Sequence, residues 1–363
     1  MKNPFKFGTV VEKPFFINRS KEIEQVKGVL ESSNHLILIS PRRYGKTSLV
    51  FNGVQDLERP VIFLDLQLVS NAEDFAAELL KRVYNEFKTA KIKELIKHFR
   101  IIPTLSLNPI TNSVDVTFQP SFKETALLED VLNLLEKLSE KKRAILVLDE
   151  FQEIKRISST LDRTLRSIMQ YHKNINYILL GSQEAIMKEI FEKKKSPFYH
   201  FGFVLYLSKI GFDDFRKFLV NSFEQIECNS EDLANQILNF TNCHPYYTQQ
   251  LAFSVWELLK QNNKEEKPVE KAITEIVYMH DLDYERLWNT LNQTDKLVLI
   301  NLAMSNLSPL SKEFLIKNSI ASSTVFSSLK RLVQQGFLIK SNTNYEIDDP
   351  FFKKWIIKKR NGE

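Results

Sequence analysis

Short aliphatic runs alternate with longer stretches of helical periodicity along residues 1–210. The runs lie at residues 36–39, 60–65, 144–150, 175–180 and 203–207. Runs of this length suit buried strands and are too short for helices. Between them, apolar residues recur at helical spacing, as at Phe75, Leu79 and Val83. This alternation predicts an α/β fold with a parallel, doubly wound sheet of at least five strands.

Residues 101–120 interrupt this alternation. Apolar and polar residues alternate there, with turn residues at Asn108-Pro109 and again near Asn112-Ser113. The pattern predicts a β-hairpin inserted between two helices. The sequence leaves open whether the hairpin is an interaction arm or a surface ornament.

Residues 211–363 have a helical pattern, and the last part of this stretch combines short helices with a hairpin. Three short helices are predicted at residues 296–304, 311–318 and 321–335. Gly336 ends the last of them, and the apolar segments 337–339 and 345–347 would pair as a hairpin. This order predicts a winged helix-turn-helix. The expected domains are an α/β core at 1–210, a helical lid at 211–290 and the winged helix at 291–363.

The loop after the first predicted strand has the pattern of a phosphate-binding P-loop. Residues 40–47 read S-x-x-x-x-G-K-T, between a strand and a helix that begins at Lys46. Backbone N–H groups and the positive helix end would surround the phosphates. Lys46 would reach the β- and γ-phosphates, and the Thr47 hydroxyl would ligate Mg²⁺. Gly45 leaves room for the phosphate, although Ser40 stands where a glycine is usual.

The phosphate-binding candidates are therefore Ser40, Pro41, Arg42, Arg43, Tyr44, Gly45, Lys46, Thr47 and Ser48. The plain alternative is a loop lysine that happens to stand beside a threonine. The preceding strand and a second motif further along the chain favour the nucleotide interpretation.

That second motif is the run 144–150, which ends in Asp149 and Glu150. A parallel strand delivers such carboxylates to the edge of the sheet where ligands bind. Asp149 would orient Mg²⁺ through Thr47 or water, and Glu150 would act as general base on the attacking water. An ordinary strand ending in a solvated acidic turn is the alternative.

Three further residues are weaker candidates. Ser182, or its neighbour Gln183, follows the run 175–180 and would sense the γ-phosphate. Arg19 precedes a helix of a kind that often packs against adenine, and Pro245 begins another helix beside two tyrosines. Polar strand ends, helix capping and a helix-start proline are the structural alternatives.

Composition indicates only the general class of protein. Hydrophobic residues make up 43% and charged residues 26% of the 363 residues, as in ordinary soluble proteins. The net charge of +5 permits a nucleic-acid partner without arguing for one. Cys228 and Cys243 have neither metal-ligand spacing nor a disulfide framework. No apolar run approaches the ~20 residues of a membrane span, and no signal peptide is apparent. The expected location is cytoplasmic, with no membrane partner.

The partner of the winged helix stays open at this stage. Its third helix is polar but lightly basic, whereas phosphate contact normally needs several Lys or Arg residues. The polar residues of this helix are Ser322, Ser323, Ser327, Ser328, Lys330 and Arg331. DNA, a protein or another part of the chain would all be compatible. The basic cluster Lys353, Lys354, Lys358, Lys359 and Arg360 adds charge near the end of the chain, and a solvated tail is its plain alternative.

Several segments together resemble the archaeal-type P-loop ATPases, a prokaryotic group near the STAND and AAA+ ATPases. They are NPFKFG, FINRSKEIEQV, SPRRYGKTSL, ILVLDEFQEI, ILLGSQ, SPFYHF and HPYYTQQLA, in that order. The resemblance implies a magnesium-dependent ATPase that acts as a conformational switch. It assigns Lys46 and Thr47 to phosphate and magnesium, and Asp149 and Glu150 to magnesium and water activation.

The resemblance also assigns Ser182 to a sensor at a strand end, and His244 with Pro245 to a lid motif at the adenine. Two positions depart from the family pattern. Cys243 replaces the usual glycine, and His200-Phe201 stands where relatives often carry an arginine. Because an arginine finger is worth roughly a thousandfold or more in turnover, either another arginine substitutes or hydrolysis is slow. The candidates are Arg42, Arg43 and Arg166.

The predicted function is a magnesium-dependent, ATP-binding and ATP-hydrolysing molecular switch whose nucleotide state is coupled to the lid and the winged helix. The alternative is a DNA- or protein-binding regulator in which ATP is a structural ligand. A nucleotide kinase on the same fold is disfavoured, because the chain lacks an arginine-rich lid and Glu150 suits water activation. The oligomeric state is open.

Overall fold

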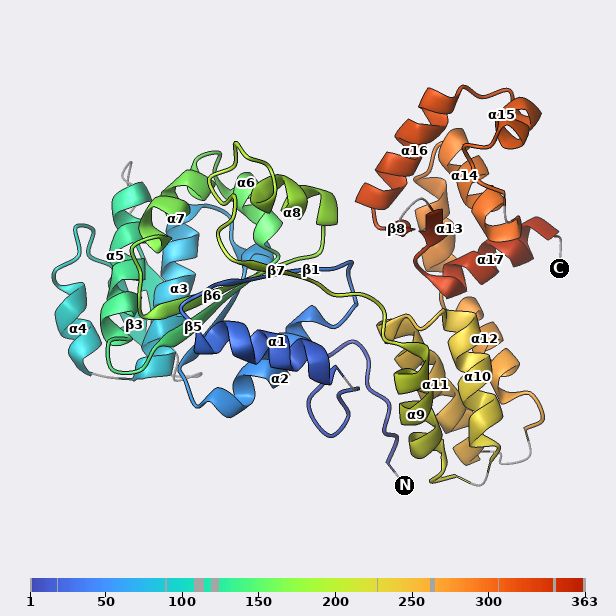
Figure 1. The fold of residues 1–363 in the computed structure, drawn as a ribbon, viewed down its shortest axis with the longest axis horizontal. Coiled ribbons are helices and arrows are strands. Elements are labelled where there is room, and N and C mark those ends of the chain that lie inside the picture. Colours follow the sequence, from blue (N-terminus) through green and yellow to red (C-terminus); the bar gives the residue numbers. More distant parts are fainter. Residues whose placement is uncertain are drawn as a thin grey trace. The chain divides into compact units, whose positions relative to one another are not determined.

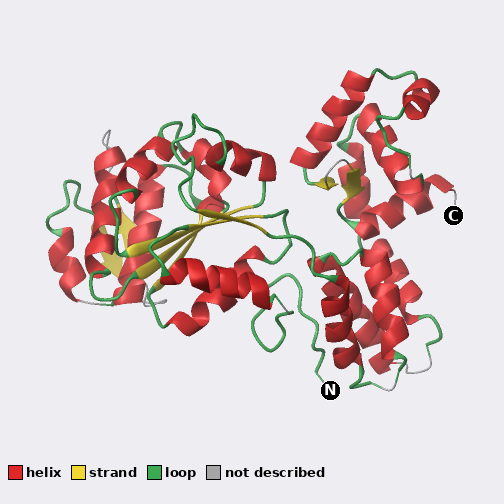
Figure 2. Cartoon of the chain, in the orientation of Figure 1, coloured by secondary structure: helices red, strands yellow, loops and turns green. Residues whose placement is uncertain are grey.

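The computed structural model describes residues 2–17, 19–88, 90–107, 114–118, 124–226, 228–261, 265–305, 307–341 and 344–361. The chain divides into two compact units. The sheet unit comprises residues 19–40 and 46–208, and the helical unit comprises residues 1–18, 41–45 and 209–363. Residues 41–45, in the middle of the predicted phosphate-binding loop, thus group with the helical unit. Figures 1 and 2 show the elements of both units.

The sheet unit contains the predicted parallel sheet. Its strands lie in the order β2 (Val61–Asp65), β5 (Ala144–Asp149), β6 (Ile175–Gly181), β1 (Leu36–Ile39) and β7 (Phe203–Tyr206). Every neighbouring pair is parallel. All residues of β1 and β6 are buried, which is why these strands are almost continuously apolar. The predicted fold class is confirmed.

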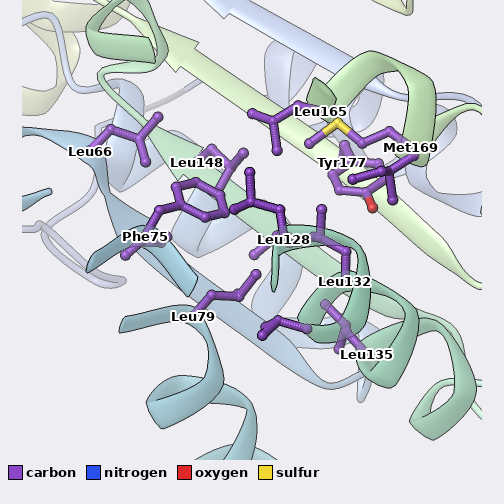
Figure 3. Packing of buried hydrophobic residues seen from close by; sticks show 14 of the residues in the cluster. Leu66, Phe75, Leu79, Leu128, Leu132, Leu135, Leu148, Leu165, Met169 and Tyr177 are labelled. Atoms are coloured by element: carbon purple, nitrogen blue, oxygen red, sulfur yellow. The ribbon is translucent and has the colours of Figure 1, made fainter. Parts of the chain in front are cut away.

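Helices flank this sheet on both faces (Figure 1). They are α1 (Ser20–Glu31), α2 (Lys46–Val54), α3 (Ala72–Phe87), α4 (Ala90–Ile96), α5 (Glu124–Leu138), α6 (Ile154–Ile157), α7 (Leu161–Met169) and α8 (Glu184–Phe191). Short 3-10 helices occur at η1 (Gln55–Leu57), η2 (Leu66–Leu68) and η3 (Phe151–Glu153). Figure 3 shows the core between α3, α5, α7 and the sheet, where Phe75, Leu128 and Leu148 are almost completely buried.

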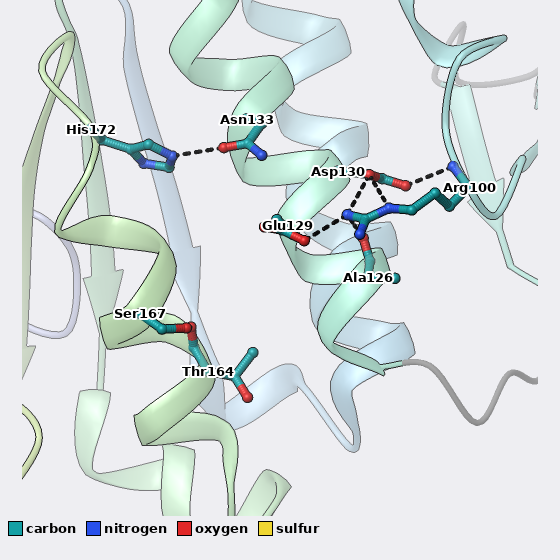
Figure 4. A network of polar contacts seen from close by, with 8 residues as sticks. All are labelled: Arg100, Ala126, Glu129, Asp130, Asn133, Thr164, Ser167 and His172. Atoms are coloured by element: carbon teal, nitrogen blue, oxygen red, sulfur yellow. Dashed lines mark hydrogen bonds and ion pairs between the residues drawn. The ribbon is translucent and has the colours of Figure 1, made fainter.

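The predicted hairpin is present and belongs to this core. Strands β3 (Thr104–Leu107) and β4 (Val114–Thr117) pair in antiparallel register. Val114 and Val116 are buried in the same hydrophobic cluster as α3, so the hairpin is packed and not a free arm. Both predicted turns fall in residues 108–113, outside the described part of the chain. Arg100 fastens the segment before β3 to α5 by hydrogen bonds to Ala126, Glu129 and Asp130 (Figure 4).

The helical unit contains the lid helices and the winged helix. The lid helices are α9 (Phe212–Phe223), α10 (Ser230–Thr241), α11 (Pro245–Gln261), α12 (Pro268–Met279) and α13 (Asp281–Asn289). The winged helix follows as α14 (Gln293–Met304), α15 (Lys312–Asn318), α16 (Ser322–Gln334), β8 (Leu338–Ser341) and β9 (Asn344–Ile347). The winged helix-turn-helix prediction is confirmed. Trp256 is fully buried in this unit, against Phe5 and Phe223.

The C-terminal segment is not the plain solvated tail that the sequence left as an alternative. It forms a helix, α17 (Pro350–Asn361), that packs against α12 and α14. Phe351, Phe352, Trp355 and Ile356 are buried, while Lys353, Lys354 and Lys358 are exposed. Because apolar residues recur one turn apart, they form a stripe that packs inward and leaves the lysines in solvent. Within the described residues, no helix has the length and apolar character to cross a membrane.

Candidate nucleotide site

The two sequence motifs meet at the carboxyl edge of the sheet unit. Thr47 lies in the first turn of α2, directly after the loop that follows β1, and Asp149 is the last residue of β5. The Thr47 hydroxyl donates a hydrogen bond of 2.9 Å to Asp149 Oδ2, across 102 positions of sequence. The fold therefore brings the threonine of the loop motif and the acidic strand end into direct contact.

The start of the loop is anchored to the sheet. The Ser40 N–H donates a 3.3 Å hydrogen bond to the Gly181 carbonyl at the end of β6. Ser40 is not among the described residues with positive φ, so a serine fits where a glycine is usual. Lys46 is buried, and its Nζ donates to the Ser40 carbonyl at 3.4 Å. The ammonium thus lies folded back against its own loop.

Gly45 has the backbone and surroundings that a phosphate cradle needs. Its φ is +86°, a conformation that only glycine adopts without strain. Apart from Gly45 itself and its two chain neighbours, no described residue has an atom within 4 Å of the place that a Cβ at Gly45 would occupy. The glycine therefore faces open space next to Lys46, which fits the approach of a phosphate group.

The electrostatics of Asp149 fit a bound cation. Burial raises the pKa of its carboxyl, although the Thr47 hydroxyl, the Glu150 N–H and the Lys46 charge act in the opposite direction. A hydroxyl and a carboxylate are the hard oxygen ligands that Mg²⁺ prefers. Among the described residues, no three His, Cys, Asp or Glu side chains are grouped to hold a metal.

Glu150 is held beside Asp149 by two neighbours. It begins the turn of η3 with a left-handed φ of 51°. The Ser182 hydroxyl, just after β6, donates 2.6 Å to Glu150 Oε2, and Gln152 Nε2 donates to the same oxygen. Sequence reasoning proposed Ser182 but missed Gln152. The available signal was the glutamine two residues after the glutamate in the LDEFQ motif.

Other predicted site residues lie in different surroundings. The Arg19 guanidinium is buried and donates to Glu22 at 3.1 Å and to the Ser208 carbonyl at 2.9 Å. Pro245 is the buried first residue of α11. Ser48 is also buried, within the first turn of α2. Arg42 is exposed.

Arg166 does not lie at this edge of the sheet. Its guanidinium carbon is 5.2 Å from the centre of the Phe201 ring, and that ring stacks on His35, which immediately precedes β1. Arg166 also donates to Gln170. It therefore lies at the amino-terminal edge of the sheet, away from Lys46 and Asp149 of its own chain.

In the helical unit, Arg43 of the loop is held by aromatic and acidic residues. Its Nη1 donates 2.9 Å to the Tyr247 hydroxyl, and its guanidinium carbon lies 4.8 Å from the centre of the Tyr246 ring. Tyr247 in turn hydrogen-bonds Asp349, whose carboxylate also caps the first turn of α17. This Arg43–Tyr247–Asp349 relay links the loop to the lid and to the last helix.

The lid motif lies beside the relay. The His244 ring is buried and meets Tyr44 edge-on at 4.9 Å between centres. His244 Nε2 lies 3.4 Å from Asp348 Oδ1. Cys243 has a φ of 55°, a left-handed backbone conformation that favours glycine.

The winged helix offers less charge to a nucleic acid than its sequence indicates. Arg331 donates to both oxygens of Asp295, at 2.9 and 2.7 Å. The Ser328 hydroxyl bonds the same carboxylate, which is buried. The Arg331 guanidinium is thus paired with a buried carboxylate of its own domain. Of the two basic residues on α16, Lys330 faces solvent.

Family models match most of the chain. Residues 16–251 match a model described as an ATPase domain predominantly from Archaea. Residues 282–358 match a model described as a probable winged helix domain. A search of curated proteins returned no match.

Solved structures share the fold over nearly the full length. The Walker-type ATPase PABY2304 of Pyrococcus abyssi superposes with a TM-score of 0.70 at 17% identity, covering 98% of this chain and 99% of that one. The Aeropyrum pernix ORC2 protein, solved as ADPNP–ADP complexes, gives 0.55 at 14% identity, covering 99% and 100%. The Aeropyrum pernix ORC1 protein in complex with DNA gives 0.51 at 12% identity, covering 99% and 98%.

Proposed function

This chain belongs to the family of ATPase domains found predominantly in Archaea, and from that premise we propose that it is a magnesium-dependent ATP hydrolase that works as a conformational switch. The observation that carries the proposal is the 2.9 Å hydrogen bond between Thr47 and Asp149. It joins the two motifs that an NTPase needs at one phosphate–metal complex.

The residues of the loop would bind the triphosphate. Backbone N–H groups of residues 40–48 and the first turn of α2 would surround the phosphates, and the Lys46 ammonium would exchange its contact with the Ser40 carbonyl for phosphate oxygens. Thr47 and Asp149 would hold Mg²⁺. When bound, this ion supplies positive charge that neutralises the β- and γ-phosphate oxygens.

Glu150 would orient the attacking water and accept its proton. The Ser182 hydroxyl donates to the same carboxylate. Ser182 would act as the sensor of the γ-phosphate. Arg19 and Pro245 remain the candidate contacts of the adenine ring.

The switch part of the proposal rests on Arg43. This loop residue is bonded to Tyr247 of the lid, which is bonded to Asp349 at the start of α17. A change in the loop on nucleotide binding would alter the Arg43 contact and so bias the lid and the winged helix. The relay therefore gives the coupling a physical route.

The alternative function is a DNA- or protein-binding regulator that keeps ATP as a structural ligand with little turnover. The observation in its favour is the lack of the family arginine, because His200-Phe201 stands in its place and Arg166 lies at the other edge of the sheet. Such a protein would bind ATP with magnesium but release almost no phosphate.

The test is ATP binding and phosphate release by the parent chain and two variants. We expect Lys46→Ala to lose ATP binding, and Glu150→Gln to keep binding and stop turnover. Competition with GTP measures the preference for adenine. Binding without phosphate release from the parent would replace the hydrolase proposal with the regulator, and absence of ATP binding by the parent would end both.

A further inference from the structure

Gln152 presents a buried group that the proposed function does not yet use. Its side chain is 4% exposed and lies in the turn of η3, directly after Glu150 and Phe151. Phe151 is fully buried against Phe198 and Phe191. The turn is therefore fixed by packing, which fixes the backbone position of Gln152.

The hydrogen bonds of Gln152 determine the orientation of its amide. Nε2 donates to Glu150 Oε2 and lies 3.4 Å from the Ser182 hydroxyl oxygen. An ionised carboxylate only accepts hydrogen bonds, so the N–H₂ side of the amide must face Glu150. The carbonyl oxygen, Oε1, then points elsewhere.

That carbonyl oxygen is buried, and no donor among the described residues reaches it. Burying an unsatisfied polar atom costs free energy, and such an atom in a folded protein calls for a specific reason, often a bound water or a functional role. A leucine would fill the same space without this cost. The placement beside the candidate general base supplies the reason.

We propose that Gln152 is a positioning residue that holds the attacking water for Glu150. Its N–H₂ group and the Ser182 hydroxyl both occupy Glu150 Oε2, so the carboxylate presents Oε1 to the water. The Gln152 carbonyl accepts one water hydrogen, and Glu150 Oε1 accepts the other as the proton that leaves. The water oxygen forms the new bond to the γ-phosphorus while the bond from phosphorus to the bridging oxygen breaks. This inference rests on the proposed hydrolase function.

The key experiment compares Gln152→Leu with the parent chain in the full-length protein. We expect kcat to fall about 100-fold, with the Kd for ATP within about threefold of the parent. The melting temperature of the nucleotide-free protein should stay within about 2 °C or rise, because an unsatisfied carbonyl is removed. A lower melting temperature together with weaker ATP binding would overturn the proposal in favour of a structural role.

A double-mutant cycle tests whether Gln152 acts through the same water as Glu150. If it does, adding Gln152→Leu to Glu150→Gln leaves the residual rate unchanged. A further 100-fold loss in that background would overturn the proposal. If the parent chain releases no phosphate, the proposed hydrolase function fails. If Glu150→Gln turns over like the parent, Glu150 is not the general base, and the positioning role of Gln152 is overturned. If Glu150→Gln is inactive while Gln152→Leu is fully active, only the role of Gln152 fails.

Discussion

The Arg43 guanidinium and the Tyr247 hydroxyl, 204 positions apart, are joined by a 2.9 Å hydrogen bond. One partner belongs to the loop that carries the nucleotide motif, and the other to the first turn of lid helix α11. Burial acts to lower the pKa of Arg43, but Tyr247, Tyr246 and Asp349 outweigh it and raise the pKa. The surroundings thus stabilise the charged guanidinium at this place.

The first prediction concerns competition for Arg43. If ATP draws Arg43 away from Tyr247, then Tyr247→Phe removes a competing hydrogen bond worth about 1 kcal/mol. The affinity for ATP should rise about fivefold, measured by titration calorimetry. Tyr246→Phe is the matched control, because it keeps the ring that contacts the guanidinium and should leave the affinity unchanged. Weaker binding by Tyr247→Phe would show that the relay supports the nucleotide-bound state instead.

A second prediction concerns Asp149 and pH. Burial raises the pKa of its carboxyl, so the folded protein holds this proton more tightly than the unfolded chain. The protonated Asp149 carboxyl therefore contributes to the free energy of unfolding at acidic pH. This contribution is lost as the pH rises through the pKa of Asp149 in the folded protein. At pH 7 the ionised carboxylate therefore destabilises the nucleotide-free protein.

Asp149→Asn should accordingly raise the melting temperature of the nucleotide-free protein at pH 7 by about 2 °C. The difference from the parent should vanish at acidic pH. The same variant should lose the additional stabilisation that Mg²⁺ gives together with ATP. Differential scanning fluorimetry across pH, with and without MgATP, measures both effects. A lower melting temperature at pH 7 would mean that the cation-free carboxylate contributes net stability.

The parts of this fold that the sequence predicts are those that have a recognisable local sequence pattern. The strand at 144–149 and the loop at 40–47 each have their own signature, and parallel strands must deliver their ends to one edge. Their contact through Thr47 and Asp149 follows from that rule. The winged helix was equally readable, because three short helices and a hairpin have separate periodicities.

The parts that the sequence did not predict depend on tertiary neighbours. The apolar stripe of α17 was not recognised in the sequence, because lysines stand between Phe352 and Trp355 and again after Ile356. The role of Gln152 depends on a 3-10 turn that returns its side chain to Glu150. The pairing of Arg43 with Tyr247 has no local signal, because it joins distant segments.

A third prediction concerns the stability of the winged helix. Asp295 is buried and accepts hydrogen bonds from Arg331 and Ser328. Arg331→Met should destabilise the protein by about 2 kcal/mol, because it removes two hydrogen bonds from a buried carboxylate and leaves only the one from Ser328 of these three. Lys330→Met, one position earlier on the exposed face of α16, should change stability by no more than about 0.5 kcal/mol. Urea unfolding monitored by fluorescence compares the two, and equal losses would remove Arg331 from its structural role.

The last prediction concerns DNA. Because Arg331 is committed to Asp295, Lys330 is the basic residue that α16 itself presents to a phosphate backbone. Each phosphate contact contributes about −0.9 to the slope of log K against log salt. Binding of duplex DNA through α16 should therefore show a slope no steeper than about −2, measured by fluorescence anisotropy between 50 and 200 mM salt. Lys330→Gln should flatten that slope by about one unit, whereas Arg331→Lys should leave it unchanged. A slope near −5 or steeper that persists in Lys330→Gln would assign DNA binding to another surface, and the lysines of α17 would be the next to test.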